Sequence, residues 1–379
     1  MPSEMSIGVY IHVPFCAYRC AYCDFAVVTG QLGRVEAYLA AVQREIGAFR
    51  RHWGPQTVGS VYFGGGTPSL LEPSAVARLL EAVAGLGTLE TEAEISLESN
   101  PDDLSAERLA GLRKAGVTRL TVGLQAVDDR RLEALGRPLE AALGLEALER
   151  ALDSGFVSVG ADLIFGSPGQ ISDRWPEEID AVLAVGPPHL SAYALETTSR
   201  TRLLRAVERG ALPAPDPDQA ATLYEVTCER LAAAGLERYE ISNFARSGHR
   251  SRHNLLYWQD RPFVGFGPSA ASYFAERRWT APRRLSEYLR TAGRAAGGAD
   301  VPPCSSDRLA GEALVFGLRL AEGIDLEAIE RRHGAAAVAR RRPVLERGVE
   351  AGLLLGEGNR FRLSSRGVLL ADEIFVDLL

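Results

Sequence analysis

The chain has 379 residues, 46% of them hydrophobic and 24% charged, a composition typical of a globular protein with a sizeable core. Its formal net charge of −7 argues against nucleic acid as the partner, because a polyanion would need a basic surface. No stretch approaches the roughly 18 apolar residues of a membrane helix, and the start MPSEMSIGVYIHVPF lacks the basic region of a signal peptide, so we expect a cytoplasmic protein.

The first half of the chain alternates short β-rich runs with longer helical patterns. Strands are predicted at residues 7–13, 57–63, 93–98, 117–125, 157–165 and 189–195. Helices are predicted between them at residues 35–49, 74–84, 106–115, 128–135 and 143–154. These βα units predict an α/β fold with a parallel sheet, either a partial barrel or a doubly wound sheet. In both arrangements, functional residues are expected where the strands end.

The pattern changes after about residue 200. A helix at 218–234 leads to a Gly- and aromatic-rich stretch, and the C-terminal part is typical of three helices, a hairpin across 356–359 and a final helix. That order predicts a small winged-helix-like module. Residues 301–379 hold 12 acidic residues and 11 Arg, which favours protein packing or partner docking over DNA binding. We therefore expect domains at 1–215, 216–290 and 300–379.

Three cysteines follow the first predicted strand with the spacing CxxxCxxC: Cys16, Cys20 and Cys23. Because cytosolic proteins seldom form disulfides, the group indicates a metal site or a catalytic site. A [4Fe–4S] cluster usually takes four thiolates, so three would leave one iron open to an external ligand. The amine and carboxylate of S-adenosylmethionine (SAM) would suit that iron.

A zinc site is the alternative reading of the cysteine loop. His12 or His253 could complete a Cys3His set. Structural zinc sites usually contain two cysteine pairs, however, and the remaining Cys228 and Cys304 lie far along the chain. The spacing therefore favours the iron–sulfur cluster.

Polar and glycine residues end the next four predicted strands. The glycines of residues 64–68 (GGGTP) would let the backbone approach a ligand and offer amides to a carboxylate, or would simply form a turn. Glu98 suits a ribose diol, although its surroundings also fit helix capping, and Gln125 ends the following strand. Asp162 lies in an apolar run, so we expect it to meet a ligand or an arginine such as Arg137.

Together these motifs are similar to a known family. They are YIHVPFCxxxCxYC at 10–23, GGGTP at 64–68, ESNP at 98–101, GLQ at 123–125 and DLIFGxPG at 162–169. They resemble the oxygen-independent coproporphyrinogen III oxidase group of radical SAM proteins, almost from end to end. The resemblance implies a partial (β/α)6 barrel with a [4Fe–4S] cluster at its rim. It also implies SAM contacts at Tyr10, Tyr22, Gly66, Thr67, Glu98, Gln125, Arg137, Asp162 and Ala194.

Two branches of that group differ near the cysteines. The decarboxylating enzymes of this group carry the motif CxxxCxxCxC. In this chain Phe25 stands at the position of their fourth cysteine. The segment 253–258, HNLLYW, matches the HNxxYW signature of the haem chaperone branch. The resemblance therefore favours a haem chaperone over an enzyme.

The HNxxYW segment supplies the candidate haem residues His253, Tyr257 and Trp258. Imidazole is a common axial ligand of haem iron, and the two aromatic rings could stack on a flat macrocycle. A lone histidine near aromatics can equally be a hydrogen-bonded packing residue. Both roles of His253 stay open at this point.

The resemblance implies two functional hypotheses. The first is a chaperone that binds haem, the cluster and SAM, and passes haem to an apo-haemoprotein such as a membrane-bound respiratory enzyme, at the inner membrane face. The second is a coproporphyrinogen III oxidase, in which SAM cleavage yields a radical that initiates propionate decarboxylation to protoporphyrinogen IX. An electron donor such as flavodoxin or ferredoxin would serve either, and whether SAM is cleaved stays open. No nucleic-acid partner is expected.

Overall fold

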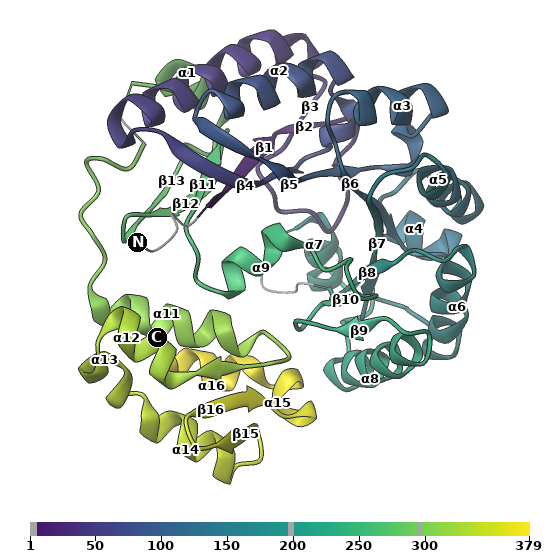
Figure 1. The fold of residues 1–379 in the computed structure, drawn as a ribbon. Helices are drawn as coiled ribbons and strands as arrows, with labels where there is room; N and C mark the ends of the chain where they lie inside the picture. Colours follow the sequence, from purple (N-terminus) through teal and green to yellow (C-terminus); the bar gives the residue numbers. More distant parts are fainter. Residues whose placement is uncertain (1–5, 196–200, 295–296) are drawn as a thin grey trace.

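The computed structural model describes residues 6–195, 201–294 and 297–379. Within them, an 11-stranded sheet curves into an open barrel with strand order β13-β12-β11-β1-β4-β5-β6-β7-β8-β10-β9 (Figure 1). Its central strands pair in parallel and are β1 (Ile7–Val13), β4 (Gln56–Gly65), β5 (Gly87–Ser99), β6 (Arg119–Gln125), β7 (Ser158–Phe165) and β8 (His189–Ala194). The predicted strands are thus confirmed, although β5 begins six residues earlier than expected.

Helices cover the outer face of this curved sheet, which distinguishes the partial barrel from a doubly wound sheet (Figure 1). The α-helices of this region are α1 (Val35–Trp53), α2 (Pro73–Ala84), α3 (Ala106–Lys114), α4 (Asp129–Ala134), α5 (Ala141–Asp153), α6 (Trp175–Val185), α7 (Arg202–Glu208) and α8 (Pro217–Ala233). Short 3-10 helices are η1 (Leu32–Arg34), η2 (Pro68–Leu70), η3 (Pro101–Asp103) and η4 (Ser172–Arg174).

The core lies between the sheet and these helices. In α1, Leu39, Val42, Ile46 and Phe49 recur at helical spacing and are buried in one hydrophobic cluster with the apolar side chains of β1. Alternate residues of the strands point the other way, into the hollow of the barrel. That inner face carries the polar side chains that the sequence placed at the strand ends.

Residues 216–290 extend the sheet at both of its edges. At one edge stand β9 (Glu237–Arg238) and β10 (Asn243–Ala245), and at the other β11 (Phe263–Phe266), β12 (Ala271–Phe274) and β13 (Arg277–Thr280). Between them in sequence, α9 (Arg252–Trp258) lies inside the arc of strands, and α10 (Leu285–Thr291) follows (Figure 1). The segment therefore belongs to the barrel in space, and α9 reaches its inner face.

The C-terminal module combines helices with a small sheet of order β14-β16-β15. Its elements are α11 (Ser306–Leu318), β14 (Ile324–Asp325), α12 (Leu326–His333), α13 (Ala335–Ala339), α14 (Arg342–Glu350), β15 (Leu354–Glu357), β16 (Arg360–Leu363), α15 (Ser365–Leu369) and α16 (Ala371–Leu378). The predicted hairpin is confirmed, but more helices surround it than expected. One reason is Gly334, whose φ of +94° ends α12 and separates it from α13.

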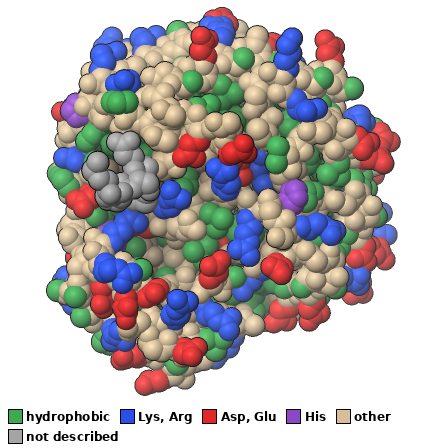
Figure 2. Space-filling view, in the orientation of Figure 1, with side chains coloured by type: hydrophobic (Ala, Val, Ile, Leu, Met, Phe, Trp, Pro, Cys, Tyr) green, Lys and Arg blue, Asp and Glu red, His purple; other side chains and the backbone are tan. Residues whose placement is uncertain are grey.

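The surface carries charges of both signs. Figure 2 shows acidic and basic side chains interspersed over the barrel and the C-terminal module on the face drawn in Figure 1. Across residues 6–195, 201–294 and 297–379, no helix is both long and apolar enough to cross a membrane.

Candidate functional site

The cysteine loop is tied down at several points. Its base is closed by two short strands, β2 (Phe15–Cys16) and β3 (Val28–Thr29), which pair in parallel. Within the loop, the Ala21 amide donates to the Leu135 carbonyl at 2.8 Å, and the Ala21 carbonyl accepts from the Leu203 amide at 2.8 Å. The loop is thus held against the barrel over the ends of the central strands.

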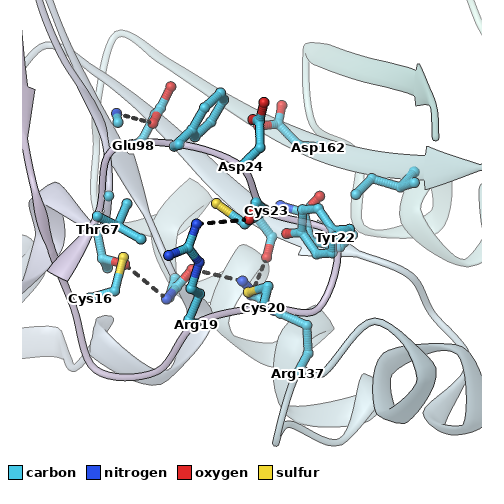
Figure 3. Close-up of a pocket in the computed structure, with 18 of the residues that line it drawn as sticks. Cys16, Arg19, Cys20, Tyr22, Cys23, Asp24, Thr67, Glu98, Arg137 and Asp162 are labelled. Carbon is cyan, nitrogen blue, oxygen red and sulfur yellow. Dashed lines mark hydrogen bonds between the residues drawn. The ribbon is translucent and has the colours of Figure 1, made fainter. Parts of the chain in front are cut away.

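All three loop cysteines line one cavity of about 480 Å³. Figure 3 shows Cys16, Cys20 and Cys23 on the loop, with Glu98 and Asp162 reaching toward the same space from the strands. The Thr67 hydroxyl lies 3.5 Å from the Cys16 sulfur. The cavity therefore brings a thiol-rich donor set and the strand-end carboxyls together.

Burial sets the protonation of the thiols. It raises the pKa of Cys16 to about 11, against a smaller lowering by the Thr67 hydroxyl, and it also raises the pKa of Cys23. In the described residues no three His, Cys, Asp or Glu side chains are held in ready-made coordination geometry. A bound cation would oppose the effect of burial, because metal binding favours the thiolate form. The donor set fits an iron–sulfur cluster.

The glycine turn packs tightly and uses its own amides. The Gly66 amide donates to the Val13 carbonyl at 2.7 Å, the Thr67 amide to the Phe15 carbonyl at 2.8 Å and the Gly65 amide to Glu98 at 3.1 Å. A Cβ on Gly66 would lie 2.7 Å from the carbonyl oxygens of Val13 and Phe15, so only glycine fits. The expectation that these amides are free for a ligand carboxylate is wrong, because the protein itself occupies them.

Glu98 is partly buried in the cavity wall and held by two donors. The Tyr62 hydroxyl donates to its Oε1 at 2.9 Å, and the Gly65 amide donates to its Oε2. Burial raises the pKa of Glu98 to about 7, with a further contribution from the neighbouring Asp162 carboxyl, while the Tyr62 hydrogen bond lowers it. Glu98 thus changes charge near neutral pH, and sequence reasoning missed Tyr62 as its partner. The sequence signal for this partner is that Tyr62 lies two residues before Gly64, so its side chain points to the same face of the strand as the start of the glycine turn.

Asp162 and Arg137 do not pair, contrary to expectation. Arg137 donates to the Asn100 side chain at 2.9 Å and to the Gly123 carbonyl at 2.6 Å. Asp162 lines the cavity, and its buried Oδ1 has no hydrogen-bond partner among the described residues. Burial raises the pKa of Asp162 to about 6. A buried acceptor without a donor is unfavourable, so this oxygen fits a ligand that brings a hydroxyl or an amine.

The end of β6 is bent. Gln125 has φ of +70°, uncommon for a residue other than glycine, and the pairing of β6 with β7 shifts register between Gly123 and Gln125. This conformation places Gln125 on the cavity wall. Backbone strain of this kind concentrates at ligand sites.

The cavity of the cysteines brings together eight of the nine residues for which the resemblance implied SAM contacts. They are Tyr22, Gly66, Thr67, Glu98, Gln125, Arg137, Asp162 and Ala194. The ninth, Tyr10, lines a second cavity of about 440 Å³ that shares Asp24, Phe25, Gly65 and Glu98 with the first.

The HNxxYW residues point in three directions. His253 is 0% exposed, and its Nδ1 and Nε2 lie 2.8 Å from the Ser60 and Tyr257 hydroxyls respectively. Burial lowers the pKa of His253 to about 3, so the ring is neutral. Tyr257 lines the second cavity, whereas Trp258 packs under the Arg319 guanidinium, 4.3 Å from the ring centroid. Of the two roles left open for His253, the structure favours the packing residue.

Comparisons with known proteins agree with this geometry. Residues 10–182 match the radical SAM superfamily, and residues 305–370 match the HemN C-terminal domain. The heme chaperone HemW of Mycobacterium tuberculosis is 40% identical, over 100% of this chain and 96% of its own. That of Bacillus subtilis is 32% identical, over 97% and 98%. The chain belongs to the HemW family of radical SAM proteins.

Membership of the HemW family confirms the branch that Phe25 and the HNxxYW segment favoured. Among solved structures, coproporphyrinogen III oxidase HemN from Escherichia coli superposes with a TM-score of 0.85 at 21% identity, over 99% of this chain and 90% of that chain. This likeness confirms the fold, including the C-terminal module.

Proposed function

We propose that this protein is a haem chaperone that binds haem, a [4Fe–4S] cluster and SAM, and delivers haem to an apo-haemoprotein. The observation that carries the proposal is the 40% identity to the HemW of M. tuberculosis along the whole chain. The phenylalanine at position 25, where the decarboxylating enzymes of the related branch carry a fourth cysteine, supports the same branch.

The residues of the 480 Å³ cavity would hold the cluster and SAM. Cys16, Cys20 and Cys23 would bind the cluster through their sulfurs, leaving the three-thiolate arrangement in which one iron accepts an external ligand. When bound, the cluster supplies that open coordination site and an electron. Glu98 and the unpartnered oxygen of Asp162 would accept hydrogen bonds from the SAM hydroxyls and amine.

The delivery step implies partners. We propose a respiratory enzyme of the inner membrane as the acceptor, with this protein acting peripherally from the cytoplasmic face. A flavodoxin or a ferredoxin would supply the electron. The C-terminal module, with its mixed surface charge, is a candidate for docking the acceptor (Figure 2).

Anaerobic reconstitution tests the proposal. We expect about four iron and four sulfide per chain, retained in Cys228→Ala and lost in Cys20→Ala, because Cys228 lies outside the loop in α8. Ferric haem titrated into the loaded protein should bind, and apo-cytochrome added afterwards should gain haem faster than from buffer. Formation of protoporphyrinogen from coproporphyrinogen III, SAM and a reductant would contradict the chaperone and support the oxidase.

A further inference from the structure

Two hydroxyl groups hold the ring of His253. Its Nδ1 lies 2.8 Å from the Ser60 hydroxyl, and its Nε2 lies 2.8 Å from the Tyr257 hydroxyl. The neutral ring donates through one nitrogen and accepts through the other, and each hydroxyl can take either part. Neither ring nitrogen can therefore reach a ligand without breaking a hydrogen bond to one of these hydroxyls.

The ring of His253 is also fixed by its neighbours. It stacks on Tyr62, with centroids 5.2 Å apart and planes 28° from parallel. A Cβ on Gly8 would lie 3.2 Å from the imidazole, so β1 packs directly against it. A residue this enclosed positions other groups and does not itself meet a ligand as large as haem.

Of the three candidate haem residues, Tyr257 is the one that lines the second cavity. The second cavity, about 440 Å³, has aromatic walls from Tyr10, Phe25 and Phe263 in addition to Tyr257. Phe25 is 58% exposed at the boundary with the cluster cavity. Aromatic walls of this kind suit a flat apolar ligand, and the volume is within the usual range of small-molecule sites.

The same cavity carries a cation suited to carboxylates. Arg283 lines it, and its side chain is exposed while donating to the Asp24 carbonyl. A guanidinium at the mouth can hold a propionate by paired hydrogen bonds. The cavity thus offers a phenol, aromatic walls and a guanidinium, which match the iron, the macrocycle and the propionates of haem.

We propose that ferric haem binds in this second cavity with the Tyr257 oxygen as an iron ligand, and that His253 is the residue that positions this oxygen. The inference rests on the proposed haem function and names its site. On binding, the iron–oxygen bond forms as the phenolic O–H bond breaks, and the proton leaves to water through the cavity mouth. The iron stays ferric, so no oxidant or reductant is needed. Tyrosinate is an established type of haem ligand, and His253 with its ring proton on Nε2 would donate to the phenolate and stabilise its negative charge.

The test titrates ferric haem and metal-free protoporphyrin IX into the cluster-loaded full-length chain. In the wild type we expect a high-spin ferric spectrum, since a phenolate is a weak-field ligand. Tyr257→Phe should abolish that signature and weaken ferric haem binding more than about 10-fold, with the affinity for metal-free protoporphyrin unchanged. Tyr273→Phe is the matched control, because Tyr273 lies next to Phe263 but does not line the cavity.

A second pair of variants separates this proposal from its rivals. His253→Gln, whose amide can still donate to Tyr257, should keep the high-spin signature with affinity reduced by about 10-fold. Loss of the signature in His253→Gln, together with its retention in Tyr257→Phe, would overturn the proposal and make His253 the ligand. If no variant, including the wild type, binds ferric haem, the proposed function itself fails.

The location of the site can be tested without touching Tyr257. Ala271 lines the cavity from β12 and is exposed, so Ala271→Trp would fill the space without a buried clash. We expect it to abolish haem binding while cluster content and SAM binding stay normal. Undiminished haem affinity in Ala271→Trp would place the haem elsewhere. This arm remains decisive if Tyr257→Phe fails to fold.

Discussion

Tyr62 links the HNxxYW segment to the cluster cavity. Its ring lies between those of His253 and Tyr10, with centroids 5.2 and 6.2 Å away, and its hydroxyl donates to Glu98. Sequence analysis placed Glu98 correctly at the end of a strand, because apolar alternation reveals strands. It could not reveal Tyr62 as the partner, since the strands that carry the two residues pair only in the folded sheet.

Tyr62→Phe should weaken SAM binding by about 10-fold, the effect of losing a hydrogen bond to a charged group. The reason is that the lost donor lets the pKa of Glu98 rise above about 7, so that less carboxylate is present to accept from SAM. Equilibrium dialysis with cluster-loaded protein at pH 7 and 8.5 measures the effect, which should shrink at the higher pH.

Tyr224→Phe is the control for that change. Tyr224 is also buried, but its hydroxyl donates to the Ile241 carbonyl away from the cavity. An equal loss of SAM affinity in both variants would show a general packing effect and contradict the role assigned to Tyr62.

Glu45 supplies a pH-dependent contribution to stability. It accepts from the Tyr288 hydroxyl at 2.6 Å and the Gly267 amide at 3.0 Å, yet burial raises its pKa from 4.5 to about 7. Between those values the folded state holds a proton that the unfolded state has released, so stability falls as pH rises through this window. Full ionisation at pH 8 costs on the order of 3 kcal/mol.

Glu45→Gln should remove that slope. Relative to the wild type, its free energy of unfolding should increase by about 2–3 kcal/mol between pH 5 and pH 8. Urea unfolding at the two pH values, on chain without cluster, gives the comparison. A difference between variant and wild type that is the same at both pH values would refute the assignment.

At the scale of elements, the sequence predicted the parallel strands well and α9 poorly. Each strand of the barrel is an apolar run bounded by polar residues, which is a local signal. By contrast, the seven-residue helix α9 buries His253, turns Tyr257 to the second cavity and packs Trp258 against Arg319. Its sequence pattern therefore lacks a single apolar face. The contact of His253 with Ser60 joins residues 193 apart, and no local pattern encodes it.

Ser251 is the residue that starts α9. Its side chain accepts from the Asn254 amide at 3.3 Å, and its own amide donates to the Tyr239 oxygen at 3.2 Å. Ser251→Ala should therefore lower the free energy of unfolding by about 1 kcal/mol. Because α9 carries Tyr257, the variant should also weaken haem binding.

Ser305→Ala is the matched control, since Ser305 caps α11 in the same way but lies on the surface. Thermal unfolding should show a similar loss of stability in both variants, with haem affinity lowered only in Ser251→Ala. Equal haem affinity in the two would contradict the role of α9 in the site.

At the scale of the molecule, the C-terminal module is fastened to the barrel by a buried charge cluster. Asp260, 4% exposed, lies 3.0 Å from His333 Nε2, 3.4 Å from Arg332 and 3.6 Å from Arg278. Trp258 adds an aromatic contact with Phe316 of α11. The sequence predicted the module and its hairpin but not this junction, because the partners lie far apart in the chain.

Asp260→Asn should destabilise the protein by on the order of 2 kcal/mol, because it removes the buried carboxylate that Arg278, Arg332 and His333 share. Asparagine tolerates the φ of +50° at this position, so the backbone should stay unchanged. Asp180→Asn, which breaks an exposed ion pair with Arg230, should cost less than about 1 kcal/mol. Urea unfolding with limited proteolysis would contradict the fastening role if the two variants behaved alike.

Asp24, Phe25, Gly65 and Glu98 form a partition between the two cavities, since each lines both. SAM would lie on one side of this partition and haem on the other. A ligand that displaces the partition when it binds would therefore change the binding free energy of the second ligand. Thermodynamic reciprocity then requires that the factor by which SAM alters haem affinity equals the factor by which haem alters SAM affinity. Loading of the cargo would thus depend on the state of the cofactor, through the four residues that the two cavities share.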